Sequence, residues 1–229
     1  MYSDSKIEVR HRSHGFSLVE MLVVIAIMSI LMTAGAIGIG SMTGKGVTSA
    51  VASAESLFDE ARSIAVGQRT RTRVLVSKTL TNVPAENLRR VVVVSEELNT
   101  DGTPKAGSWI LSSRGVTLPD QVFFSQNLSQ KDHKSGGALE EMDMAGAKAA
   151  YQGVYYYYEF NSEGICTTPA ASFVVGAGAR NKTTNKPRLT AAGKRDFGGF
   201  VVWRNGRTSA FRSPTQISGA TSLNTNSEF

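Results

Sequence analysis

A long apolar run near the start of this 229-residue chain, residues 15–39, constrains its fold more than any other segment. The run is long enough to cross a lipid bilayer as a helix, which takes roughly 20 apolar residues. One acidic residue, Glu20, lies just inside its start. A charge within a bilayer costs roughly 2.5–3.5 kcal/mol on insertion scales and usually has a partner. A helix that serves only as a membrane anchor gains nothing from this charge, so Glu20 indicates a role beyond anchoring.

The polar segment before the run differs in layout from a secretory signal. Residues 1–15 carry three lysine or arginine residues and two acidic residues, and we expect their positive charge to keep them cytoplasmic. An ordinary signal peptide is cut after its apolar stretch, at small residues. Here the obvious processing motif, Gly15-Phe16, precedes the apolar stretch. The alternative is a signal anchor that holds a glutamate by chance.

Gly15 followed by Phe-Ser-Leu-Val-Glu resembles the type III signal of type IV prepilins and pseudopilins. The resemblance implies that a membrane-embedded prepilin peptidase and N-methyltransferase cuts after Gly15 and methylates the amine of Phe16. It also implies that Glu20 pairs, in the assembled filament, with the Phe16 amine of a neighbouring subunit. The physics agrees, because a buried carboxylate that loses its cationic partner costs roughly 3–5 kcal/mol.

The rest of the sequence divides by periodicity. After a glycine-rich stretch, apolar residues recur every three or four positions from Val47 to Ala65, which predicts an amphipathic helix that packs on a sheet. From Arg71 onward, runs of β-branched and aromatic residues alternate with turns, and Asn205-Gly206 predicts a hairpin. Four consecutive tyrosines, 155–158, should place two rings on each face of a strand.

We therefore predict an α+β chain with the order of the pilin fold, in which a long N-terminal transmembrane and amphipathic helix packs on a C-terminal antiparallel β-rich domain. Residues 126–150 are interpreted as a polar insertion with a short helix near 139–144. The predicted segments are a leader at 1–15, a membrane and assembly helix at 16–40, its amphipathic continuation at 41–67, a β-rich periplasmic domain at 68–213 and a flexible tail at 214–229.

Three later motifs add a more specific resemblance. Ala61-Arg62-Ser63-Ile64-Ala65, the run from Phe160 to Gly164, and Gly206-Arg207 resemble segments of the H-type minor pseudopilins and their FimT-like relatives. This resemblance implies a structural subunit of a filament.

Composition excludes some other classes of protein. A single cysteine, Cys166, rules out an intrachain disulfide and is interpreted as a packing residue. No cluster of cysteine and histidine residues has metal-ligand spacing, and no nucleotide-binding loop is present. Glu140, Glu141 and Asp143 could bind a cation, but we interpret them as an exposed helix face. We therefore predict no enzymatic activity, no catalytic residues, no metal and no cofactor.

The net charge of +6 is concentrated in one stretch, where residues 180–212 hold nine lysine and arginine residues and one aspartate. Such a stretch is a candidate anion-binding surface, and a solvated face is the alternative. Some FimT-like relatives bind DNA through a Gly-Arg-x-Arg motif. Here the second arginine is missing, and Arg204, Arg207 and Arg212 are the candidate DNA contacts.

The sequence thus predicts a minor pilin or pseudopilin of a type IV pilus or a type II secretion system. A DNA-binding minor pilin of an uptake pilus is the alternative. The expected partners are the prepilin peptidase, other pilins or pseudopilins, the inner-membrane assembly platform and membrane lipid. The chain would cross the inner membrane once, with its leader in the cytoplasm and its C-terminal domain in the periplasm.

Overall fold

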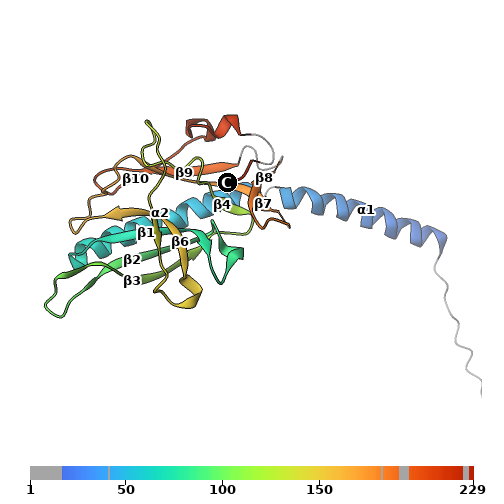
Figure 1. Ribbon diagram of the computed structural model, residues 1–229. Helices are drawn as coiled ribbons and strands as arrows, with labels where there is room; N and C mark the ends of the chain where they lie inside the picture. Colours follow the sequence, from blue (N-terminus) through green and yellow to red (C-terminus); the bar gives the residue numbers. More distant parts are fainter. Residues whose placement is uncertain (1–16, 41, 182, 191–195, 224–226) are drawn as a thin grey trace, which may run out of the picture. The chain divides into compact units, whose positions relative to one another are not determined.

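The computed structural model describes residues 17–40, 42–181, 183–190, 196–223 and 227–229 (Figure 1). It consists of two compact units, residues 1–41 and 42–229. The described part of the first unit is one helix, α1, from Leu18 to Gly40. The second unit begins with α2, from Met42 to Gln68. Both helices include glycines, so the glycine-rich stretch remains helical at its described positions.

After α2, the second unit is built from β-strands and short 3₁₀ helices. The strands are β1 (Thr72–Leu80), β2 (Arg90–Leu98), β3 (Pro104–Thr117), β4 (Val122–Phe124), β5 (Glu141–Asp143), β6 (Gly153–Phe160), β7 (Ala171–Arg180), β8 (Pro187–Leu189), β9 (Phe197–Val202) and β10 (Thr208–Ala210). The described 3₁₀ helices are η1 (Pro84–Glu86), η2 (Ala149–Tyr151), η4 (Pro214–Gln216) and η5 (Ala220–Ser222).

The described strands form two antiparallel sheets. The first sheet has the order β3-β2-β1-β6-β5, and the second has the order β10-β9-β7-β4, with β8 paired to β7. The predicted hairpin is present, because β9 and β10 pair in the register Thr208 to Val202 on either side of Asn205-Gly206. The prediction of an α+β chain, with an N-terminal helix and an antiparallel β-rich domain, is confirmed.

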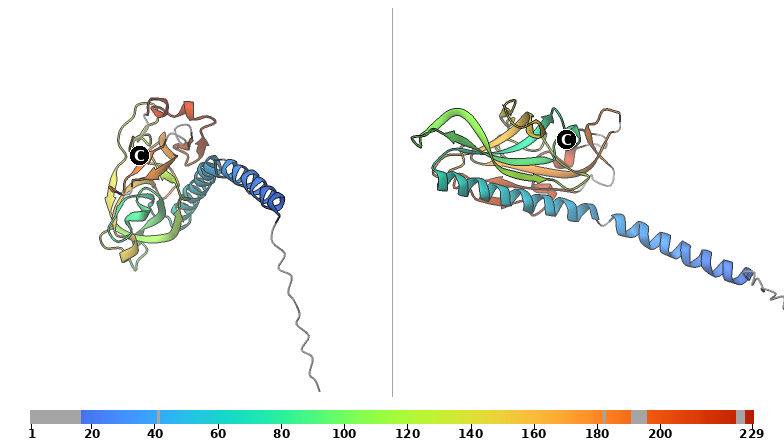
Figure 2. Two further views of the ribbon diagram at one scale, coloured as in Figure 1. Left: turned by 90° about the vertical axis from the view of Figure 1, so that its right-hand side faces the viewer. Right: turned by 90° about the horizontal axis from the view of Figure 1, so that it is seen from below.

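Helix α2 lies along both sheets, and Figure 2 shows it as one side of the second unit. Its buried stripe follows the predicted spacing, and alanines at four of its positions are fully buried, which lets the strands approach the helix closely. The buried residues of the stripe are Val47, Ala50, Ala54, Leu57, Phe58, Ala61 and Ala65.

The ring of Phe58 joins the helix to both sheets. Its centroid lies 5.0 Å from that of Tyr158 in the first sheet and 5.0 Å from that of Phe200 in the second. Both pairs meet edge to face, a geometry worth about 0.5–1.5 kcal/mol beyond the area buried. Phe160 and Phe173 complete the cluster around the same ring. One aromatic residue of α2 therefore lies at the centre of the whole core.

The central strands of the first sheet, β2, β1 and β6, are largely buried on both faces. Tyr156 and Tyr158 face the core beneath α2, whereas Tyr155 belongs to a second apolar cluster on the opposite face, and Tyr157 packs against that cluster. This confirms that the four tyrosines divide between the two faces. The second cluster includes Leu75 and Val92, and Met144 and Tyr151, from the segment after β5, cover it.

Two predictions about irregular segments are wrong. The predicted helix near 139–144 contains a strand, β5, because its residues pair with β6 from Glu141 to Asp143. The tail is not loose where it is described, because Ile217 and Phe229 are 2% and 3% exposed. The ring of Phe229 packs between Phe123 and Phe197. Isolated apolar residues in a polar segment carry no periodicity, so the sequence pattern could not reveal this packing.

We predict that Phe58→Ala destabilises the second unit by about 3–5 kcal/mol, because it removes a fully buried ring and leaves a cavity between the helix and both sheets. Thermal unfolding of the full chain in detergent, followed by near-ultraviolet circular dichroism, measures the effect. Ser56→Ala, an exposed position on the same helix, is the control and should be nearly neutral. A loss for Phe58→Ala no greater than for the control would contradict this account of the core.

Candidate processing and assembly site

The start of α1 is the site that the sequence singles out. Gly15 and Phe16, the predicted cleavage and methylation residues, lie outside the described residues. The first described residue is Ser17, whose carbonyl accepts a hydrogen bond from the backbone N–H of Met21 at 3.2 Å. The helix therefore begins within the first residues that the structure describes, directly after the predicted cleavage point.

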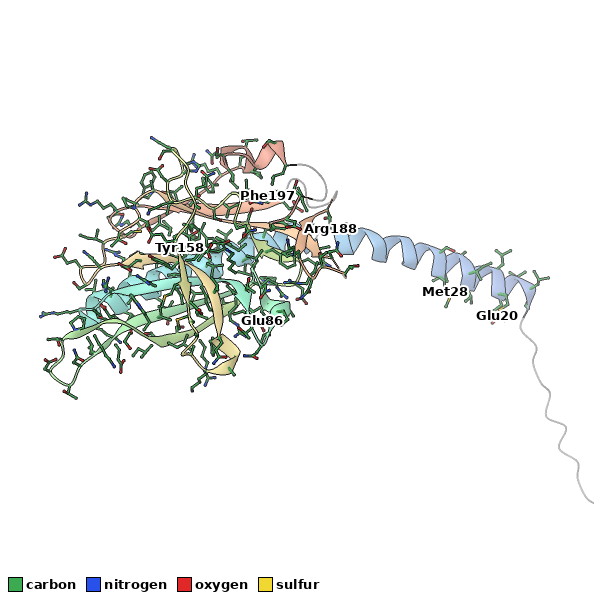
Figure 3. All side chains as sticks on the ribbon, viewed as in Figure 1. Glu20, Met28, Glu86, Tyr158, Arg188 and Phe197 are labelled. Carbon is green, nitrogen blue, oxygen red and sulfur yellow. The ribbon has the colours of Figure 1, made fainter. Side chains whose placement is uncertain are left out.

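Glu20 lies in the first turn of α1, and its side chain is exposed (Figure 3). A negative charge in this turn is stabilised by the helix dipole, by about 0.3–1 kcal/mol in water. Among the described residues, its carboxylate has no ion-pair or hydrogen-bond partner. Its charge is therefore available to a group outside the described part of the chain.

The side chains around Glu20 are apolar and exposed on every side of the helix. Leu18 and Val19 are 83% and 69% exposed, and each described side chain from Ser17 to Met28 is exposed. Consecutive residues of an α-helix project about 100° apart, so this exposure covers the full circumference. A helix that is apolar all round is normally buried in protein or lipid.

No helix within the described residues combines the length and the apolar character needed to span a membrane.

The three candidate anion-binding arginines lie along the β9–β10 hairpin, and all are exposed. Arg204 and Arg207 share the tight turn, which is closed by the hydrogen bond from the Trp203 N–H to the Arg207 carbonyl at 2.8 Å. Arg212 follows β10, beside the backbone pair formed by the Phe211 N–H and the Gly199 carbonyl. The three residues of β10, which span roughly 10 Å, lie between Arg212 and the turn that holds the other two.

The structure brings together the three short motifs that the sequence resemblance used. The side chain of Arg62, on α2, packs against Gly164 and Gly206. Both glycines have a positive φ, in the left-handed region. A Cβ atom at Gly206 would lie 2.6 Å from the Cδ of Arg62, and one at Gly164 would lie 3.1 Å from its Cγ. The Arg62 Nε is buried there without a hydrogen-bond partner among the described residues. The three motifs therefore form one packing junction at the C-terminal end of α2.

Sequence reasoning missed a charged and aromatic network on the outer face of the first sheet. The guanidinium of Arg73 lies between the rings of Trp109 and Tyr157, 4.1 Å and 4.0 Å from their centres, and its Nε donates to Glu159 at 2.7 Å. The neighbouring pair joins Arg71 to Glu96 at 2.6 Å. This hydrogen bond holds the pKa of Glu96 below its ordinary value. Because side chains alternate along an extended chain, the sequence places Arg71 and Arg73 on one face. It does not show which neighbouring strands bring their acidic and aromatic partners to that face.

The described residues contain no group of three or more histidine, cysteine or acidic side chains that could hold a metal ion. Cys166 is buried, as predicted, and burial raises the pKa of its thiol. A raised pKa leaves little thiolate at neutral pH, so this cysteine is a poor nucleophile.

Comparisons with known proteins bear on the N-terminal segment. Residues 10–36 match the family model described as the prokaryotic N-terminal methylation motif, so the predicted prepilin-type signal is confirmed. No curated protein matches the sequence.

Two crystal structures are similar to the chain. The type IV minor pilin FimU of Pseudomonas aeruginosa is 14% identical, with a TM-score of 0.31 over 73% of this chain and 93% of that one. The minor pseudopilin EpsH of the type II secretion system of Vibrio cholerae is 12% identical, with a TM-score of 0.38 over 74% of this chain and 95% of that one.

The Arg62 junction yields a prediction about stability. Gly206→Ala should cost about 1–2 kcal/mol for its positive φ and about 1–3 kcal/mol more for its contacts with the Arg62 side chain and the Gly164 carbonyl oxygen. Gly102→Ala is the matched control, because Gly102 has a similar φ of +79° and nothing within 4 Å of the added Cβ. Thermal unfolding of both variants separates backbone strain from packing. Equal losses would show that neither Arg62 nor the Gly164 carbonyl packs tightly against this turn.

Proposed function

We propose that the chain is a minor pilin or pseudopilin that is processed at its N-terminus and built into a filament of the type IV pilus or type II secretion kind. The observation that carries the proposal is the match of residues 10–36 to the prokaryotic N-terminal methylation motif. A structural subunit needs no catalytic site, and the assembly chemistry resides in the first turn of α1. A DNA-binding role is not proposed, because no observation favours it.

In this proposal the apolar segment first holds the chain in the inner membrane, with the leader in the cytoplasm and the β-rich domain in the periplasm. Lipid would cover the exposed apolar side chains of α1. The prepilin peptidase would then cut after Gly15 and methylate the amine of Phe16. The new cationic N-terminus would lie one helical turn from Glu20, because four residues of α-helix make about one turn.

Assembly would then follow from the cost of burying an unpaired carboxylate. Within a bundle of α1 helices, Glu20 would need a cation, and the Phe16 amine of the neighbouring subunit supplies one. Because an unpartnered buried charge costs roughly 3–5 kcal/mol, only one axial register of neighbouring helices would satisfy it. Other pilins or pseudopilins and the assembly platform of the inner membrane are the partners that this role requires.

Processing is tested by the intact mass of the chain extracted from membranes with an active prepilin peptidase. We expect a mature chain that starts at Phe16 and carries one added methyl group. Gly15→Leu should leave the full-length, unmethylated chain, because a bulky residue replaces the glycine before the cut. Cleavage after the apolar segment, or an uncut wild-type chain, would overturn the proposal.

The role of Glu20 is tested by Glu20→Ala. The variant should insert into membranes at least as well as the wild type, because a costly charge is removed, but should enter filaments much less efficiently. Membrane fractionation measures the first property, and cross-linking to neighbouring subunits measures the second. Asp59→Ala, at an exposed acidic position on α2, is the control and should change neither. Equal cross-linking of the Glu20→Ala variant and the wild type would refute the pairing.

A further inference from the structure

We propose that the open edge of β3 binds an extended acidic peptide segment of another chain, which adds to the first sheet as a further strand. This inference concerns the β-rich domain alone and does not depend on the processing of the N-terminus. It rests on an unpaired strand edge, a groove beside it and two unpaired basic side chains.

β3 is the outermost strand of the first sheet (Figure 1). Within the described residues, β2 is the one strand that pairs with it, so the opposite row of backbone N–H and C=O groups is open. Trp109, Ile110 and Leu111 pair with β2 in an unbroken register, and irregular positions occur only before and after them. Proteins normally protect such an edge with bulges, prolines or charges, because it is a template for pairing with another strand.

A groove of about 440 Å³ lies beside this regular stretch. β3 forms one wall, through Trp109 and Leu111, and the segment after β5 forms the other, through Met144 and Tyr151. Ile110, at the same stretch, is 48% exposed. An added strand would form main-chain hydrogen bonds with the edge while alternate side chains enter the groove, which is how β-strand addition combines affinity with specificity.

The charge of the groove determines the kind of peptide. Arg114 and Lys148 line it, both are exposed, and no acidic residue lines it. Neither side chain has an ion-pair partner among the described residues, whereas Lys105, earlier on the same strand, pairs with Glu97 at 3.2 Å. The complementary ligand is therefore an extended segment in which apolar residues alternate with acidic ones.

The test uses the full chain in detergent micelles and a short fluorescent peptide of alternating aspartate and valine, with fluorescence anisotropy as the readout. We expect the wild type to bind this peptide. The double variant Arg114→Glu with Lys148→Glu should bind it at least about tenfold more weakly and should instead bind a lysine–valine peptide. Arg69→Glu with Lys134→Glu changes net charge equally at exposed sites outside the groove and should leave binding unchanged.

A second peptide distinguishes strand addition from simple charge attraction. An aspartate–valine peptide with alternate amides N-methylated keeps its charges and side chains but cannot donate along one edge, so it should not bind. The proposal is overturned if this peptide binds as well as the first, if the groove variant binds as well as the wild type, or if the aspartate–valine peptide does not bind at all. Groove-dependent binding of anionic lipid vesicles without peptide binding would also overturn it.

Discussion

The contact of Phe58 with aromatic rings of both sheets is the interaction on which the β-rich unit depends. Neither sheet has a complete core without α2, because Tyr158 and Phe200 meet across the same helical side chain. The alanines on either side of Phe58 keep the helix close enough for this contact. With its inner faces fixed in this way, the unit places other features outward, among them the edge of β3, the Arg73 network and the β9–β10 hairpin.

α1 presents the opposite situation. Most of its described side chains are apolar, yet they are exposed around the whole circumference. Apolar surface of this extent requires cover, which supports the proposal that lipid and neighbouring helices supply it. In the proposed filament, Glu20 would change from a solvated charge at a helix N-terminus to a costly buried one, and its partner would determine how neighbouring subunits align.

Much of the fold could be predicted because its signals are periodic. The stripe from Val47 to Ala65 and the alternation in the tyrosine run are local patterns, and burial follows them directly. The hairpin at Asn205-Gly206 was visible because Asn-Gly between two apolar runs favours a tight turn, and Gly206 adopts the positive φ that the turn uses. By contrast, β5 is defined by its pairing with β6, and the packing of Phe229 depends on Phe123, far away in sequence, so no local pattern specifies either of them.

The same division holds for the candidate sites. Glu20 and the motif around Gly15 are read from adjacent residues, and the family match covers the same segment. The groove beside β3 joins residues 109–114 to residues 144–151, and only the strand order brings them together. The short motifs at Arg62, Gly164 and Gly206 are intermediate between a site that adjacent residues reveal and a site that only the fold assembles. Their residues were visible in sequence, but their meeting at one junction was not.

The most direct test of the central claim is a zero-length carbodiimide cross-link in assembled filaments that combine isotope-labelled chain with unlabelled neighbours. If Glu20 pairs with the terminal amine of a neighbour, mass spectrometry should find the labelled peptide that contains Glu20 joined to an unlabelled N-terminal peptide. A Glu20 that stays unlinked, or that links only within its own chain while surface lysines cross-link between subunits, would contradict the account.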